Sequence, residues 1–220
     1  MTVALLLVLW DMSALDLPLA RLSGGSSGFA LREHWLLASV LHDGARRVGW
    51  ALALLLCVAV WFPVGWLRRV AFHRRVQLAL TTLVAVTAIS TLKSFSRTSC
   101  PWSLAEFGGV AHYVPHWSNF FVADGGNGRC FPAGHASSGF SFFGGYFALR
   151  RDLPQLAVVW LIATVAVGMA LGIAQQVRGA HFMSHTLWTG WICWCTAWAI
   201  DALVSRHNVT NVTANLAPSA

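Results

Sequence analysis

Three polar clusters stand at the ends of long apolar stretches in this sequence. Their members are Lys93, Gly134, His135, Arg178, His181 and His185. A lysine and an arginine can together hold an anionic phosphoryl group, the arginine through a bidentate fork of N–H donors. A glycine at a helix start lets a backbone N–H approach an oxyanion, and two histidines can divide nucleophilic attack from proton donation. These residue types therefore predict phosphate chemistry.

The elements that must position these clusters are membrane helices. Of the 220 residues, 56% are apolar and only 10% are charged, whereas soluble domains carry about 25% charged residues. This composition excludes a soluble globular domain and predicts an all-α, polytopic membrane helical bundle: one domain over 1–206, followed by a polar cytoplasmic tail over 207–220. The net charge of +7 forms no basic stripe interleaved with polar residues, so we expect no nucleic-acid partner.

Six stretches are apolar enough to cross the hydrocarbon core of a bilayer as helices, which takes about 20 residues. They run over 2–20, 48–66, 76–94, 134–149, 155–175 and 182–204. A further stretch, 28–45, places Leu31, Trp35 and Val40 on one face at helical spacing and predicts an interfacial helix.

The arginines of the short loops predict the orientation. Those at 68–69, 74–75 and 150–151, together with Arg206, fall in loops that share one side of the membrane. The positive-inside rule makes that side cytoplasmic, although the arginines at 46–47 lie on the other side. We therefore expect an integral protein of the inner (cytoplasmic) membrane, with both termini in the cytoplasm and the three clusters facing the periplasm or the exterior.

The order and spacing of the clusters resemble the type-2 phosphatidic acid phosphatase superfamily of integral-membrane lipid phosphatases. Its motifs are K-x-x-x-x-x-x-R-P, P-S-G-H and S-R-x-x-x-x-x-H-x-x-x-D, which align with 93–101, 132–135 and 174–185. The match is imperfect, and among the positions that depart from the motifs an Arg, a Ser, an Arg and an Asp of the family are replaced. The replacing residues are Cys100, Ala133, Gln175 and His185.

A branch of this superfamily matches the departures. The runs C-P-W at 100–102, C-F-P-A-G-H-A-S at 130–137 and R-G-A-H-F-M-S-H at 178–185 are similar to that branch. The departures would then be features of a lineage and not signs of an inactive enzyme.

The resemblance implies a mechanism. His181 would attack phosphorus and form a phosphohistidine, His185 in the aspartate position would orient His181, and His135 would protonate the leaving oxygen. Water would then hydrolyse the intermediate, and no metal or other cofactor would be required. The groups that neutralise the phosphoryl oxygens would be Lys93, Arg97, Arg178 and the N–H of Gly134.

The implied substrate is a lipid phosphate or diphosphate in the bilayer, since family members act on phosphatidic acid, phosphatidylglycerophosphate, undecaprenyl diphosphate and lipid A. Two other functions stay open. A phosphohistidine can pass its phosphate to a second lipid, which would make the protein a phosphotransferase. A non-catalytic lipid-binding or transport protein could also keep the same fold.

His135, His181 and His185 raise the alternative of a three-histidine metal site, because two of them lie four residues apart. Phe182 occupies the place of the glutamate in the H-E-x-x-H pattern. We therefore expect no metal here.

Cys100 and Cys130 both fall on the outer side, where an oxidising compartment would allow a disulfide between them. The aromatic residues that follow His135 suit core packing, and they could also line a groove for an acyl or prenyl chain. These aromatic residues are Phe140, Phe142, Phe143, Tyr146 and Phe147.

Overall fold

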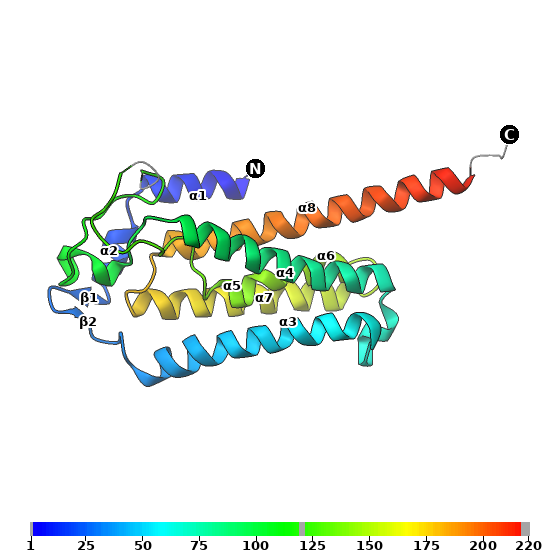
Figure 1. The fold of residues 1–220 in the computed structure, drawn as a ribbon, viewed down its shortest axis with the longest axis horizontal. Helices are drawn as coiled ribbons and strands as arrows, with labels where there is room; N and C mark the ends of the chain where they lie inside the picture. Colours follow the sequence, from blue (N-terminus) through cyan, green and yellow to red (C-terminus); the bar gives the residue numbers. More distant parts are fainter. Residues whose placement is uncertain (1, 119–121, 217–220) are drawn as a thin grey trace.

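Long apolar helices form the body of the protein in a computed structural model, which describes residues 2–118 and 122–216 (Figure 1). Four stretches are long and apolar enough to cross a membrane, and they indicate an integral membrane protein. These stretches are Leu36–Arg69, Phe72–Phe95, Pro154–Val177 and Met183–Arg206. The helices that compose them are α3 (Ala45–Trp61), α4 (Phe72–Phe95), α7 (Pro154–Val177) and α8 (Met183–Leu216). The prediction of an all-α membrane bundle is confirmed.

The centre of the bundle is a short, broken helical segment, enclosed by the long helices. It consists of α5 (Ser137–Phe140), the 3-10 turn η6 (Ser141–Phe143) and α6 (Gly144–Leu149). Helix α7 approaches it closely at Gly139, where a Cβ would lie 2.4 Å from the backbone nitrogen of Gly168. The segment is shorter than the four candidate spans, so six crossings stay a prediction.

The stretch 2–20 is not one spanning helix, and that prediction is wrong. Helix α1 (Thr2–Met12) ends before Ala14, which has a positive φ of 53°, and α2 (Asp16–Arg21) starts in a new direction. The reason is the buried carboxylate of Asp16, whose Oδ1 accepts the backbone N–H of Ser184 at 3.0 Å. Asp16 thereby provides an acceptor for a backbone N–H at the start of α8 that has no partner within its own helix. A straight helix over 2–20 would lose that hydrogen bond.

The interfacial helix expected over 28–45 is also absent. Strand β1 (Gly24–Gly25) pairs antiparallel with β2 (Gly28–Phe29), and the π-helical turn η1 (Leu36–Gly44) runs directly into α3. Phe29 is buried and packs against Phe107, which pulls the first part of the stretch into the folded end of the bundle. The remainder is the first part of the long Leu36–Arg69 span.

A cap of loops and short elements covers one end of the bundle (Figure 1). It contains α2, the β1–β2 hairpin, and the 3-10 turns η3 (Pro101–Ser103) and η4 (Ala105–Phe107). Asp124 holds the cap loop together, because its carboxylate accepts the N–H and the hydroxyl of Ser99 at 2.7 and 2.9 Å. The cap surrounds the ends of α4 and α8, where the polar clusters lie.

At the opposite end, α4 follows the 3-10 turn η2 (Gly65–Arg69), and a buried ionic network joins α4, α6 and α8. Asp201 accepts from Arg74 at 3.1 Å, from Gln77 at 2.8 Å and from Arg150 at 2.7 Å. Helix α8 continues beyond the other helices to Leu216, through most of the predicted tail; residues 217–220 lie outside the described part of the chain (Figure 1).

Replacing Asp201 with alanine should lower the stability of the bundle by about 3–5 kcal/mol, because it leaves the buried guanidinium of Arg74 without its anionic partner. Thermal unfolding in detergent measures the loss. Asp152→Ala, at an exposed carboxylate in the loop after α6, is the matched control. Equal melting temperatures for the two variants would contradict a stabilising role of the network.

Candidate active site

His181 lies in the short connection between α7 and α8, and its position follows from how α7 ends. Gly179 adopts a left-handed φ of 74°, and its N–H donates to Gln176 O while the next N–H, of Ala180, donates to Gln175 O. This is the turn with which glycine commonly ends a helix. The chain then leads His181 into the buried interior, where it is 3% exposed.

The imidazole of His181 is held by a backbone carbonyl. Its Nδ1 lies 2.8 Å from the oxygen of Cys130. Because a carbonyl oxygen only accepts, Nδ1 carries the proton, and Nε2 presents its lone pair. Burial, followed by the positive charge of Lys93, lowers the pKa of His181 well below its ordinary value. The residue is therefore a neutral imidazole at neutral pH, as a nucleophile must be.

His185 makes no hydrogen bond through either ring nitrogen within the described part of the chain. Its ring is fully buried, 5.8 Å from the ring of His181 and in edge-on contact with the rings of His116 and Phe131. The hydrogen bond that orients His181 thus comes from the Cys130 carbonyl and not from the residue in the aspartate position.

Lys93, at the end of α4, lies against Gly134. A Cβ on Gly134 would be 3.5 Å from Nζ of Lys93, so the lysine side chain crosses the glycine backbone. The loop that carries Gly134 is fixed to α8, because Ala133 donates its N–H to His185 O at 3.3 Å and accepts from the Thr189 hydroxyl at 3.2 Å. The ends of α4 and α8 and the start of the central segment therefore meet here.

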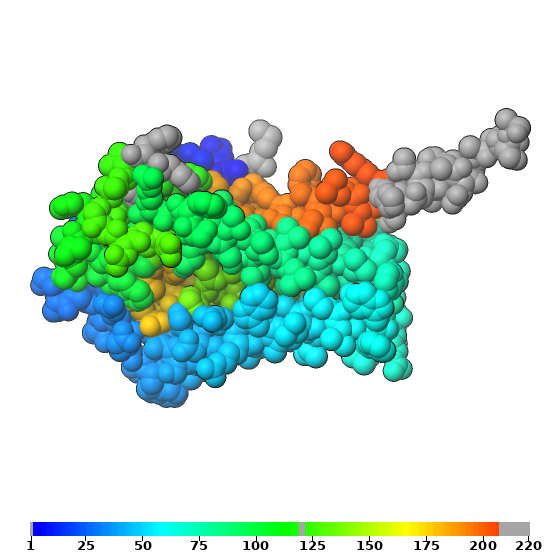
Figure 2. Space-filling view, in the orientation of Figure 1, coloured from blue at the N-terminus to red at the C-terminus, as the bar shows by residue number. Residues whose placement is uncertain are grey.

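A cavity of about 270 Å³ opens beside these groups, between α3, α4 and the central segment. Lys93, Gly134 and His135 line it together with Arg46 of α3, and its lining contains no acidic residue. We call it the phosphate cavity. Figure 2 shows the surface hollowed between α3 (blue to cyan) and α4 (green), with the central segment (yellow-green) in the floor. His181 is not among the residues that line the cavity, but the charges of Lys93 and His135, which do line it, lower the pKa of His181.

His135 is surrounded by positive charge. Its pKa is lowered to about 3, mainly by burial and then, in decreasing order of effect, by the charges of His42, Lys93, Arg178 and Arg46. The ring of His42, on the π-helical turn η1, stacks on His135 with 3.6 Å between centroids. An anionic ligand in the cavity would meet three basic side chains, Arg46, Lys93 and His135, and no carboxylate in its lining.

Known families supply the remaining comparison. The family model of the PAP2 superfamily matches residues 74–208, which span α4 to α8 and contain all three polar clusters. The chain belongs to the PAP2 superfamily. Membership of this superfamily supports a phosphatase or phosphotransferase. Comparison with curated proteins and with solved structures finds no match.

The altered motif positions of this PAP2 protein have structural explanations. Ala133 is fully buried in an apolar cluster with Ala85 and Phe143. Gln175 accepts from Nη1 of Arg178 at 3.1 Å, and Arg178 also donates from Nε to Arg32 O at 2.8 Å, so its guanidinium is fixed in place.

Cys100 and Cys130 are joined by a disulfide, with their Cα atoms 5.2 Å apart. This bond ties the first motif to the residue whose carbonyl holds His181. Arg97 is not brought to the phosphate cavity. It lines a separate surface depression of the cap with Ser96 and Arg129.

The sequence analysis missed the contribution of α3 and η1 to the site of this PAP2 protein. Arg46 and His42 precede the residues matched by the family, and no motif marks them. One signal was present: the orientation predicted from the loop arginines places Arg46 on the outer side, against the positive-inside rule. His116 was also missed; it is 6% exposed and stacks on Phe131 beside His185. No group of three His, Cys, Asp or Glu that could hold a metal ion is found in 2–118 and 122–206.

The depressed pKa of His135 predicts loss of stability in acid. Between its folded pKa of about 3 and its unfolded value of about 6.5, the unfolded chain binds more protons, so stability falls as the pH drops below about 6.5. Between about pH 7.5 and pH 5, the wild type should lose about 2 kcal/mol more than His135→Gln. Thermal unfolding at both pH values measures this, with the exposed His73→Gln as control. Identical pH sensitivity in all three proteins would contradict a buried, neutral His135.

Proposed function

We propose that this protein is a lipid phosphatase that removes the terminal phosphate of a lipid phosphate or diphosphate through a phosphohistidine at His181. One observation carries the proposal: the neutral imidazole of His181, whose Nδ1 is committed to the Cys130 carbonyl, is close enough to Lys93 and His135 of the basic cavity for their charges to lower its pKa. The cap, with this site, faces the periplasm or exterior, and the Asp201 network lies at the cytoplasmic end of an inner-membrane protein.

The first step is attack of His181 Nε2 on phosphorus. The N–P bond forms as the bond from phosphorus to the lipid oxygen breaks, and His135 gives its proton to that oxygen. A phosphate dianion beside His135 raises its pKa from the low value of the empty site, which makes the imidazolium available. Because His181 is 3% exposed, side chains around it must move to admit the phosphoryl group.

The second step is hydrolysis. Water attacks phosphorus, neutral His135 takes the proton of the water, and the N–P bond breaks to release phosphate and restore His181. Lys93, Arg178 and Arg46 neutralise the phosphoryl oxygens in both steps, with the N–H of Gly134. Charge stabilisation of this kind is usually the largest catalytic contribution. None of these steps uses a metal ion.

Phosphate release in detergent with excess EDTA tests the reaction. The panel holds phosphatidic acid, phosphatidylglycerophosphate, undecaprenyl diphosphate and lipid A. We expect release by the wild type, and a fall of about 10²–10⁴-fold in His135→Ala, the size of a general acid–base contribution. His181→Ala should abolish release, and the exposed His112→Ala should leave it unchanged. No release from any lipid, or release that EDTA abolishes, would overturn the proposal. Detection of a phosphorylated acceptor lipid among the products would instead favour a phosphotransferase.

Arg46 provides a second test, because it takes over part of the charge that the altered motifs lack. Arg46→Ala should lower kcat/KM by about 10–100-fold, the size of one hydrogen bond to a charged group. Arg47→Ala is the matched control, since Arg47 is the next residue on the same helix and does not line the cavity. Equal effects of the two substitutions would show that only the overall charge of the helix start matters.

A further inference from the structure

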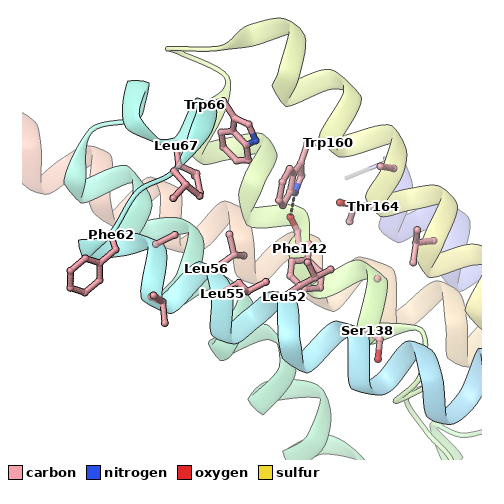
Figure 3. Close-up of a pocket in the computed structure, with 16 residues that line it drawn as sticks. Leu52, Leu55, Leu56, Phe62, Trp66, Leu67, Ser138, Phe142, Trp160 and Thr164 are labelled. Carbon is pink, nitrogen blue, oxygen red and sulfur yellow. Dashed lines mark hydrogen bonds between the residues drawn. The ribbon is translucent and has the colours of Figure 1, made fainter.

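A second, larger cavity runs along the other side of α3. It has a volume of about 610 Å³ and lies between α3, α7 and the central segment. Figure 3 shows Leu52, Leu55 and Leu56 of α3 on one side, with Phe142 and Trp160 opposite. We call it the chain groove.

The chain groove and the phosphate cavity share two lining residues, Ser138 and Phe142. Helix α3 crosses the central segment at this point, because a Cβ on Gly49 would lie 3.3 Å from Cβ of Ser138. The two cavities therefore lie next to each other, on either side of this contact: the phosphate cavity extends toward α4 and the chain groove toward α7.

The lining of the chain groove is apolar, apart from the hydroxyl groups of Ser138 and Thr164. The indole N–H of Trp160 donates a hydrogen bond to the carbonyl of Phe142 at 2.7 Å (Figure 3). Trp160 therefore faces the groove only with its apolar ring. Such a surface offers few groups to a polar ligand, and none of the residues that line it is charged. The phosphate cavity next to it carries Lys93, Arg46 and His135. Together they match a molecule with an anionic head and a hydrocarbon chain.

The rim of the groove is open to the bilayer. Leu55 is 62% exposed and Val167 is 48% exposed, on the two helices that form its edges. A chain can therefore enter sideways from the membrane while its head remains at the capped end. From Leu52 to Phe62 the groove follows α3 for about 15 Å, which is about half of the ~30 Å hydrocarbon core.

We propose that the chain groove binds one hydrocarbon chain of the lipid whose phosphate occupies the phosphate cavity. This inference rests on the proposed function and specifies the substrate: a phosphorylated lipid with a single chain inserted in the protein. A volume of about 610 Å³ holds one chain of about twenty carbons, if a methylene occupies roughly the 30 Å³ of a water molecule. A second chain, where the lipid has one, stays in the bilayer.

The test is binding of single-chain alkyl phosphonates, which cannot be hydrolysed, to the protein in lipid nanodiscs. For the wild type, affinity should rise with chain length up to about twenty carbons and then level off. Ala163→Trp fills the groove from α7, and Leu55→Trp fills it from α3. Each should weaken binding of a long-chain phosphonate about tenfold and leave a short-chain phosphonate unchanged. Ala166→Trp, an exposed α7 position outside the groove, is the control.

Activity on matched long-chain and short-chain phosphate esters separates the two proposals. A wild type that releases no phosphate but keeps the chain-length dependence refutes the phosphatase and supports the groove. An active wild type whose phosphonate affinity does not depend on chain length refutes the groove alone. Equal weakening of long and short phosphonates by both groove substitutions would also overturn it, because it would mean damage to the phosphate cavity.

Discussion

The hydrogen bond from His181 Nδ1 to the carbonyl of Cys130 is the interaction on which the site depends. It fixes the tautomer of a buried imidazole, and much of the cap serves to hold that carbonyl still. The N–H of Cys130 donates to Thr98 O at 2.9 Å, its sulfur is bonded to Cys100, and Trp102 donates its N–H to Gly179 O at 2.9 Å. The first motif, the second motif and the α7–α8 connection are thereby linked in one small region. A carbonyl oxygen carries only a partial charge, so it orients the imidazole without the desolvation cost of a buried carboxylate.

The second constraint is the sign of the charges. Ionisable groups at membrane depth are costly, and they are retained where a ligand or a water-filled cavity stabilises them. Lys93, Arg46 and His135 share one cavity whose lining has no Asp or Glu. At the other end of the bundle, Arg74 and Arg150 both pair with Asp201. The buried guanidinium of Arg74 is therefore neutralised by a carboxylate of the protein at one end, whereas the lining of the cavity at the other end contains basic groups and no carboxylate. This contrast supports the proposal of an anionic ligand in the cavity.

The composition and the motif spacing were sufficient to predict the bundle, the family and the residues that meet at its capped end. They were insufficient wherever a contact between residues far apart in the sequence determined the local structure. The apolar run 2–20 reads as a spanning helix, but Asp16 bends away to accept the N–H of Ser184. The run 28–45 reads as amphipathic, but Phe29 is drawn into the cap by Phe107. Arg46 reads as an exception to the positive-inside rule until α3 is seen to line the cavity. Each case depends on a tertiary contact that no local pattern contains.

The altered motifs show how charge can be kept while its carriers change. Where the family has an arginine, Gln175 now holds Arg178, one turn further along the chain, by a side-chain hydrogen bond. Where the family has a serine, Ala133 packs into the apolar core, and the cavity draws hydroxyl groups from Ser137, Ser138 and Ser141. Phosphoryl recognition requires positive potential and donors at the right place, and it does not require them from fixed sequence positions. Since α3 and η1 lie outside the matched family region yet place Arg46 in the cavity lining and His42 on the ring of His135, the N-terminal part of the chain helps to build the candidate site.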